Sequence, residues 1–169
     1  MSLTEQKLLE LGLSLPAPLG PSPLAEHLVF KQVDRWIFLS GTGPILEKKP
    51  AFRGRLVWTV RRREDRMKHE DGYEAARLAA LNVISILKDH GVDLDRVEIV
   101  KITGYVAGDP DFYDQHMILN GASHLFNDVF GQRGAHVVTA VGCSSLPFDV
   151  PVILDVVCRL PEEEKEEAK

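Results

Sequence analysis

The sequence predicts an α+β domain in which a mostly antiparallel sheet carries two long helices on one face. Two segments have apolar residues at helical spacing, and several short runs are rich in β-branched residues. Their order along the chain is strand, strand, a candidate third strand, helix, strand, helix, strand, strand. With 44% apolar and 27% charged residues over 169 positions, the chain has the composition of a globular domain with one buried core.

Residues 1–24 are expected to form an N-terminal helix followed by a proline-rich arm. Thr4–Leu11 predicts the short helix, with Thr4 as its N-cap and Gly12 at its end. Leu15–Pro23 contains four prolines, which fix the backbone and remove hydrogen-bond donors. This arm should therefore be extended and make no sheet ladder of its own.

The predicted domain, residues 25–160, begins with two β-rich runs. Leu28–Val33 and Trp36–Ser40 are separated by Asp34-Arg35, which indicates a hairpin. The segment Gly41-Thr42-Gly43-Pro44 should end the second strand. Arg55–Val60 is the candidate third strand.

The two long helices have clear apolar periodicity. Asp71–His90 predicts the first helix, and Gly91 follows where a C-terminal cap belongs. Val97–Ala107 predicts a buried strand. A second helix should start at Asp109-Pro110-Asp111 and end at Gly131.

Two further strands, Val137–Val141 and Val152–Val157, should be joined by a turn around Ser144–Asp149. Residues 161–169 form a charged tail.

Two helices can cover one face of such a sheet. We expect the other face to carry apolar residues, and contiguous apolar patches are unusual on monomers. The residues expected on that face are Ile102, Val106, Val141 and Val156. We therefore predict that several copies of the chain associate and bury this face.

Composition also excludes several classes of protein. The net charge of −5 argues against binding nucleic acid through the overall field of the protein. No apolar run approaches the roughly 20 residues that cross a bilayer, and the first residues do not have a secretory-signal pattern. Two cysteines are too few for a disulfide framework. They are also too few for a four-cysteine zinc site, and we therefore expect a cytoplasmic protein without membrane contact.

Five sequence pieces resemble the RidA (YjgF/UK114) family, and in particular its longer RidA-like subgroup, and they occur in the family's order. They are Trp36–Gly41, Glu74–Asn82, Leu94–Val97, Asn120–Ser123 and Ala140–Pro147. The resemblance implies a chorismate-mutase-like fold and a homotrimer with a small-metabolite cleft at each subunit interface. It also implies hydrolysis of reactive imines and enamines, a deaminase activity that needs no cofactor. Relatives carry an older label, endoribonuclease L-PSP-like.

The resemblance also implies positions for site residues. The family's deaminases carry an arginine eight residues before the Leu-Pro pair, where it binds the substrate carboxylate; this chain has Val138 there. A valine cannot replace that bidentate, charge-assisted contact. The acidic residue that orients water falls on Asp155, and the cleft asparagine falls on Asn120. The remaining candidates, in the main-chain walls of the cleft and beside them, are Gly41, Thr42, Gly43, Thr139, Ala140 and Cys143.

Several alternatives remain open. Asp155 is either a general base or a structural partner at an interface, and Cys143 is either reactive or an inert buried thiol. The basic run Arg61–His69 is either a solvated loop or the source of an arginine that replaces the missing anchor. His116, Asn120 and His124 recur on one helical face, which indicates a solvated or interface surface more than a metal site.

The function predicted is that of a divergent imine or enamine hydrolase lacking the carboxylate anchor. A non-catalytic trimer that binds a metabolite or a protein is the alternative. An RNA-acting protein is the third and weakest hypothesis, because the basic run has no interleaved aromatic residues on which bases could stack.

Overall fold

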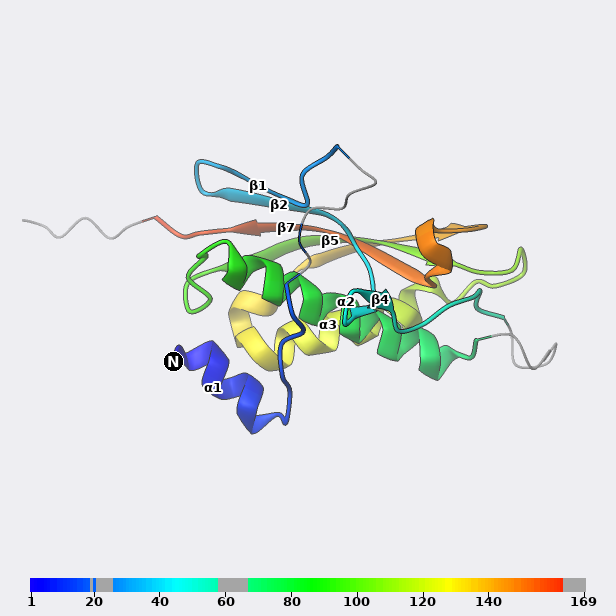
Figure 1. The fold of residues 1–169 in the computed structure, drawn as a ribbon, viewed down its shortest axis with the longest axis horizontal. Coiled ribbons are helices and arrows are strands. Elements are labelled where there is room, and N and C mark those ends of the chain that lie inside the picture. Colours follow the sequence, from blue (N-terminus) through cyan, green and yellow to red (C-terminus); the bar gives the residue numbers. More distant parts are fainter. Residues whose placement is uncertain (19, 21–25, 58–66, 163–169) are drawn as a thin grey trace, which may run out of the picture.

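The computed structural model describes residues 1–18, 20, 26–57 and 67–162 as a sheet with its helices on one side (Figure 1). The five strands of the sheet lie in the order β1-β2-β7-β5-β6. Their bounds are Phe30–Val33 for β1, Trp36–Thr42 for β2, Glu98–Ala107 for β5, Val137–Cys143 for β6 and Val152–Arg159 for β7. The pair β5–β6 is parallel and the other three pairs are antiparallel. The predicted α+β class is confirmed, with a mixed sheet.

The two long helices, α2 (His69–Asp89) and α3 (Gln115–Phe130), pack beneath the sheet in Figure 1. Gly91 follows α2 with a φ of 72°, and Gly131 caps α3 with a φ of 58°. Both glycines stand where left-handed backbone ends a helix. Each helix therefore ends where the sequence predicts. Two short strands, β3 (Ile45–Leu46) and β4 (Lys49–Pro50), form a separate hairpin.

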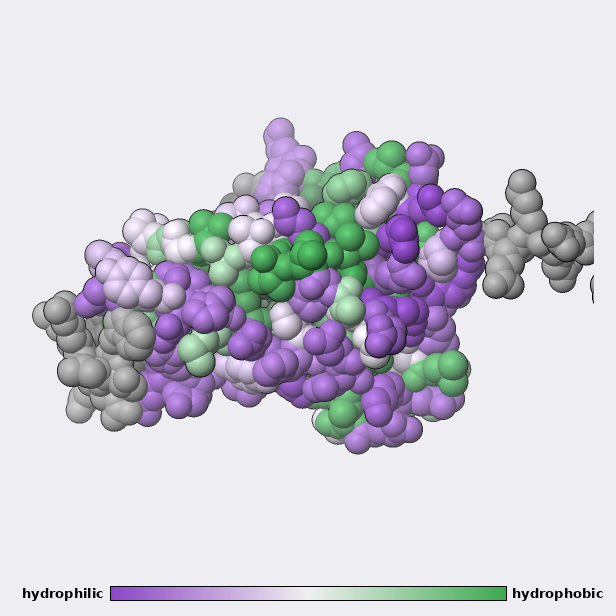
Figure 2. Space-filling view, turned by 180° about the vertical axis from the view of Figure 1, so that it is seen from behind, coloured by the Kyte–Doolittle hydropathy of each residue, from purple (hydrophilic) through white to green (hydrophobic). Residues whose placement is uncertain are grey.

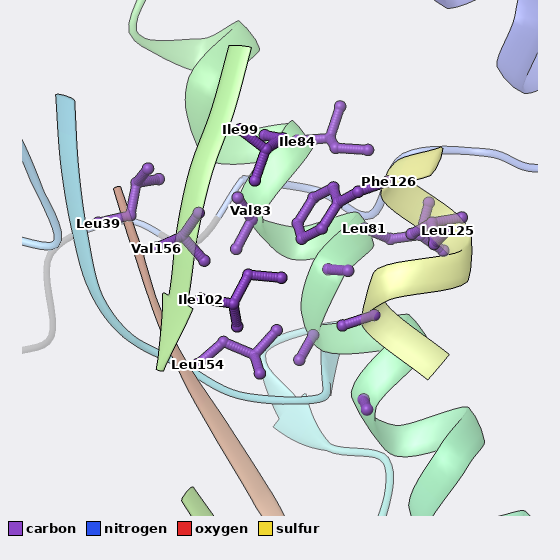
Figure 3. Packing of buried hydrophobic residues seen from close by; sticks show 14 of the residues in the cluster. Leu39, Leu81, Val83, Ile84, Ile99, Ile102, Leu125, Phe126, Leu154 and Val156 are labelled. Carbon is purple, nitrogen blue, oxygen red and sulfur yellow. The ribbon is translucent and has the colours of Figure 1, made fainter. Parts of the chain in front are cut away.

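The core lies between the helices and the sheet (Figure 3). Ile102, Val106 and Val156 are almost fully buried there, so the prediction that they lie on the uncovered face is wrong. Both faces of β5 carry β-branched residues, Ile102 on one and Thr103 on the other, and a two-residue period could not assign them. Val141, the fourth residue of that prediction, is half-buried.

The predicted third strand and the start of the second helix differ from the structure. Within Arg55–Val60, Leu56 makes single bridges to Met67 and Gly108, and residues 58–60 lie outside the described part. The Asp109 amide donates to the Leu56 carbonyl, and the Phe112 amide donates to the Asp109 carbonyl, so this segment forms a turn and not the first turn of a helix. The helix α3 consequently begins at Gln115, after Asp114, and not at Asp109.

The N-terminal helix α1 (Leu3–Glu10) begins one residue earlier than predicted, and Ser2, not Thr4, is its N-cap. The Ser2 hydroxyl accepts from the Glu5 amide, and the Glu5 carboxylate accepts from the Ser2 amide, which is a capping box. The Thr4 side chain is buried and donates to the Leu94 carbonyl. Leu8 joins the core, so α1 is packed against the domain.

The carboxylate of Asp95 holds α1 from outside the helix. It accepts hydrogen bonds of 2.8 Å from the amides of Leu3 and Thr4. Desolvation raises the pKa of Asp95, but the hydrogen bonds from Thr4 and Leu3 and the charge of Arg133 outweigh it, so that this pKa lies below its usual range. The carboxyl is therefore ionised in the folded state and binds the positive end of the helix dipole.

We expect Asp95→Ala to lower the free energy of unfolding by about 1–2 kcal/mol, the cost of losing a helix cap, and to expose α1 to proteases. A carboxyl whose folded-state pKa is depressed stabilises the protein above its unfolded pKa, and that contribution is lost as the pH falls through the folded value. The difference in the free energy of unfolding between the natural chain and the variant should thus be present at pH 7 and shrink below about pH 4. Urea denaturation across this range measures it; a gap that does not change with pH would contradict the assignment.

Candidate functional site

Asp155 and Gly41 are joined by a hydrogen bond at a bulge in β2. The Gly41 amide donates to Asp155 Oδ1 at 2.9 Å. The register between β2 and β7 shifts between Leu39 and Thr42, and Gly41 has a φ of 63°, a conformation that glycine adopts without strain. Asp155 is half-buried, and its neighbours Leu154 and Val156 face the helices. The carboxylate therefore lies on the face of the sheet opposite α2 and α3, the open face.

Thr42 and Gly43, the next two predicted wall residues, are buried. The Gly43 carbonyl accepts from Asn82 Nδ2 at 3.1 Å, and the same nitrogen donates to the Ile45 carbonyl. Asn82 comes from α2 and is itself fully buried. Of the three residues Gly41 to Gly43, only Gly41 is exposed. The other two are held by the core.

The residues of β6 divide between the two faces of the sheet. Thr139 pairs with Thr103, which pairs with Asp155, so these three residues form one row on the open face. Val138 pairs with Ile102, which pairs with Val156, and this row faces the helices. Val138 is nevertheless 43% exposed, because β6 is the edge strand. It lies on the opposite face of the sheet from Asp155.

The edge formed by β6 and α3 is apolar along the strand and polar along the helix. Val137 is 64% exposed, Ala140 is exposed, and Asn120 is exposed on α3. The surface of the molecule seen from behind shows a hydrophobic band across its middle (Figure 2). The described residues of β6 carry no cation at all. No residue of this strand can therefore bind a carboxylate as the family's arginine does at the position of Val138.

Cys143 ends β6 and is half-buried. Burial raises the pKa of its thiol, and a hydrogen bond from the Ser145 backbone opposes the rise only in part. The fully buried Cys158 has its pKa raised to about 12 by burial. Thiols with raised pKa values are poor nucleophiles at neutral pH. The structure thus favours an inert Cys143.

Two other candidates gain partners. His124 Nδ1 lies 3.0 Å from the Tyr73 hydroxyl, which joins α3 to α2. His69, at the end of the predicted basic run, lies 2.8 Å from Asp114 Oδ2, while residues 61–66 lie outside the described part. Within the described ranges, no group of three or more histidine, cysteine or acidic side chains could hold a metal ion. Nor does any described helix have the length and apolar character needed to cross a membrane.

An open groove of about 500 Å³, which sequence patterns did not indicate, lies at the end of the sheet where β5 and β6 begin. Its lining residues are Trp36, Glu98, Ile99, Val100, Gln132, Arg133, Ala135, His136, Val137 and Arg159. Arg159 is paired with Glu98 through a 3.0 Å hydrogen bond from its Nε. Residues from four separate segments meet here, so no local spacing could have revealed the groove.

This fold belongs to a known class of α+β proteins. The family described as endoribonuclease L-PSP matches residues 20–159, and the chain belongs to this RidA/YjgF family. It is 33% identical over 152 residues to protein TCP17 of Trypanosoma cruzi, a match that covers 89% of each chain.

Solved structures agree with this assignment. Protein Atu1372 of Agrobacterium tumefaciens is 32% identical, with a TM-score of 0.80 over 94% of this chain and 92% of that one. A proposed endoribonuclease of Shewanella oneidensis MR-1 is 26% identical, with a TM-score of 0.83 over 94% of this chain and 100% of that one. The shorter YjgF product of E. coli is 18% identical with a TM-score of 0.56 over 88% and 96% of the two chains, and it shares the fold alone.

Proposed function

We propose that this chain forms a homotrimer whose interface clefts bind and hydrolyse a small imine or enamine that has no carboxylate. The observation that carries the proposal is the division of the candidate residues. Asp155 and Gly41 lie on the open face of the sheet, whereas Asn120 and Val138 lie on the helix side of its edge. Because the sheet separates these two groups, one copy cannot bring them together. A site that contains both needs a second copy.

The chemistry of each half supports this substrate class. A carboxylate that faces a partly dry cleft can orient or deprotonate a water molecule. The Gly41 amide holds Asp155 through Oδ1, and Oδ2 has no hydrogen-bond partner among the described residues. On the other half, exposed Val138 presents methyl groups where a carboxylate-binding site would present a guanidinium. An uncharged ligand suits this pair of walls.

Ammonia release from 2-aminoacrylate, generated by a serine dehydratase, tests the role of position 138. We expect the natural chain to be close to background and Val138→Arg to gain roughly tenfold to hundredfold, the worth of one charge-assisted contact. Val137→Arg is the matched control, because that neighbouring side chain points to the other face of the sheet. Strong activity of the natural chain, or an equal gain in both variants, would contradict the proposal.

The hydrolytic step is tested with a carboxylate-free imine, benzylidene methylamine, followed by its absorbance. The natural chain should accelerate hydrolysis, and Asp155→Asn should lower the enzymatic rate roughly a hundredfold. Asn keeps an oxygen that can accept from the Gly41 amide, so the bulge in β2 should survive. An unchanged rate would exclude Asp155 as the base.

A trimer that binds the ligand without hydrolysing it is the second candidate. The hydrogen bond from the Gly41 amide to Asp155 favours this candidate, because it gives the carboxylate a structural role in stabilising the bulge of β2. If the natural chain binds the imine saturably but does not accelerate its hydrolysis, this second candidate is supported and the hydrolase is excluded.

A further inference from the structure

Ser123 and His136 form a hydrogen-bonded pair that the imine chemistry does not use. Ser123 Oγ, on α3, lies 2.9 Å from His136 Nε2, just before β6. The other ring nitrogen, Nδ1, lies 2.5 Å from the Gly134 carbonyl oxygen. The histidine thus bridges a hydroxyl and a backbone carbonyl.

The carbonyl determines which nitrogen carries the proton. A carbonyl oxygen can only accept, so Nδ1 must donate to Gly134. In the neutral imidazole, Nε2 is then unprotonated and accepts the hydrogen bond of the Ser123 hydroxyl. A nucleophile, a base within hydrogen-bond reach and a third group that orients the base are the parts of a serine nucleophile site.

Neighbouring residues on α3 orient the His136 ring and offer hydrogen-bond donors beside Ser123. The His136 ring packs edge-on against Phe126, with ring centroids 6.1 Å apart, which fixes its plane. Both Ser123 and His136 are half-buried, so neither is sealed in the core. Asn120 and Asn127 are exposed on α3 one turn before and one turn after Ser123, and residues three and four apart share a helix face. Their side-chain amides are donors of the kind that stabilise an oxyanion.

His136 also borders the open groove. Ile99, Ala135 and Val137 provide apolar contacts in that groove, which suits an alkyl or aryl acyl chain. The groove is open to solvent, so an ester can enter it without a change in the fold.

We propose that Ser123 and His136 form a second catalytic centre, for small carboxylic esters with an apolar acyl chain. Ser123 Oγ bonds to the acyl carbon while its proton passes to His136 Nε2. The ester bond then breaks, and the leaving alcohol takes that proton. Water hydrolyses the acyl-serine with His136 again as the base, which releases the acid and restores the hydroxyl. Acyl transfer needs neither an imine nor the trimer cleft, so this centre does not rest on the proposed function.

Diisopropyl fluorophosphate is the probe for the serine. The phosphorus–Oγ bond forms as fluoride leaves, and peptide mapping should locate one diisopropylphosphoryl group on Ser123 of the natural chain. His136→Gln should slow labelling roughly a hundredfold or more, because general-base assistance is lost. Ser14→Ala is the matched control, since Ser14 is an exposed serine in the N-terminal arm, and it should label like the natural chain.

Hydrolysis of p-nitrophenyl butyrate should fall in parallel in Ser123→Ala and His136→Gln. The labelled natural chain carries the positive result even where a variant folds poorly. Absence of label on Ser123, or a labelling rate unchanged in His136→Gln, would overturn the proposal. Loss of imine hydrolysis in Asp155→Asn with full labelling of Ser123 would show that the two centres are separate.

Discussion

Replacing Phe38 by glutamate is expected to reduce the native mass from three times 18.9 kDa to 18.9 kDa. The reason lies on the open face of the sheet. Trp36 is 39% exposed and Phe38 is 46% exposed on β2, and both face away from the helices, unlike their neighbours Ile37 and Leu39. Val157 of β7 is paired with Phe38 and continues this surface. Such a patch is typical of an interface, and a carboxylate at its centre would have to be desolvated without a partner.

Light scattering coupled to size exclusion measures the mass. Leu9→Glu is the matched control, because Leu9 is an exposed apolar residue on α1 and remote from the sheet face, so this variant should remain trimeric. Phe38→Glu should retain its helical circular dichroism, since Phe38 is not part of the core. A natural chain that elutes at 18.9 kDa would overturn the trimer, and an unchanged mass in Phe38→Glu would move the interface away from β2.

The sequence predicts best what local patterns encode. The period of α2 and the glycine after it place its C-terminal end at His90 and Gly91, as the structure has it. The hairpin between β1 and β2 follows from Asp34, which adopts a φ of 52° in the turn. These features depend on neighbouring residues alone.

The errors arise where distant segments decide. Ile102 could be assigned to a face only by knowing the pairing of β5 with β7, whose register shifts between Ile99 and Lys101. The helix α3 does not start at Asp109, because the Asp109 amide donates to the carbonyl of Leu56, more than fifty positions away, and the next residues form a turn. Local propensity cannot report either contact.

In the candidate site, too, the contacts between distant segments could not be predicted from local patterns. Asp155 was recognised from a resemblance, but its hydrogen bond to Gly41 requires the bulge between two strands far apart in sequence. The Ser123–His136 pair joins a helix to the segment before β6, and no spacing rule links a mid-helix serine to a histidine thirteen residues later. Chemistry that depends on tertiary contact is visible only once the fold is known.

Replacing Gly121 by alanine is expected to lower the free energy of unfolding by about 3 kcal/mol, toward the upper end of the cost of overpacking a core. Helix propensity alone predicts the reverse, a gain of about 1 kcal/mol for alanine over glycine. Packing decides here, because α2 crosses α3 at Gly121. An added Cβ would lie 2.0 Å from the Tyr73 carbonyl oxygen and 3.2 Å from the Arg77 amide nitrogen. Both atoms are backbone, so relief requires the two helices to separate.

Urea denaturation at one fixed protein concentration measures the loss, since the stability of an oligomer depends on concentration. Asp128→Ala, at an exposed position of the same helix, should change stability by no more than about 0.5 kcal/mol. Gly104→Ala gives a graded comparison, because its Cβ would meet Leu119 side-chain atoms at 2.2 Å and a side chain can rotate away. The expected order of loss is Gly121→Ala first, then Gly104→Ala, then Asp128→Ala. A Gly121→Ala protein as stable as the natural chain would mean that the helices cross further apart, and the α3 edge carrying Asn120 and Ser123 would then have to be placed anew.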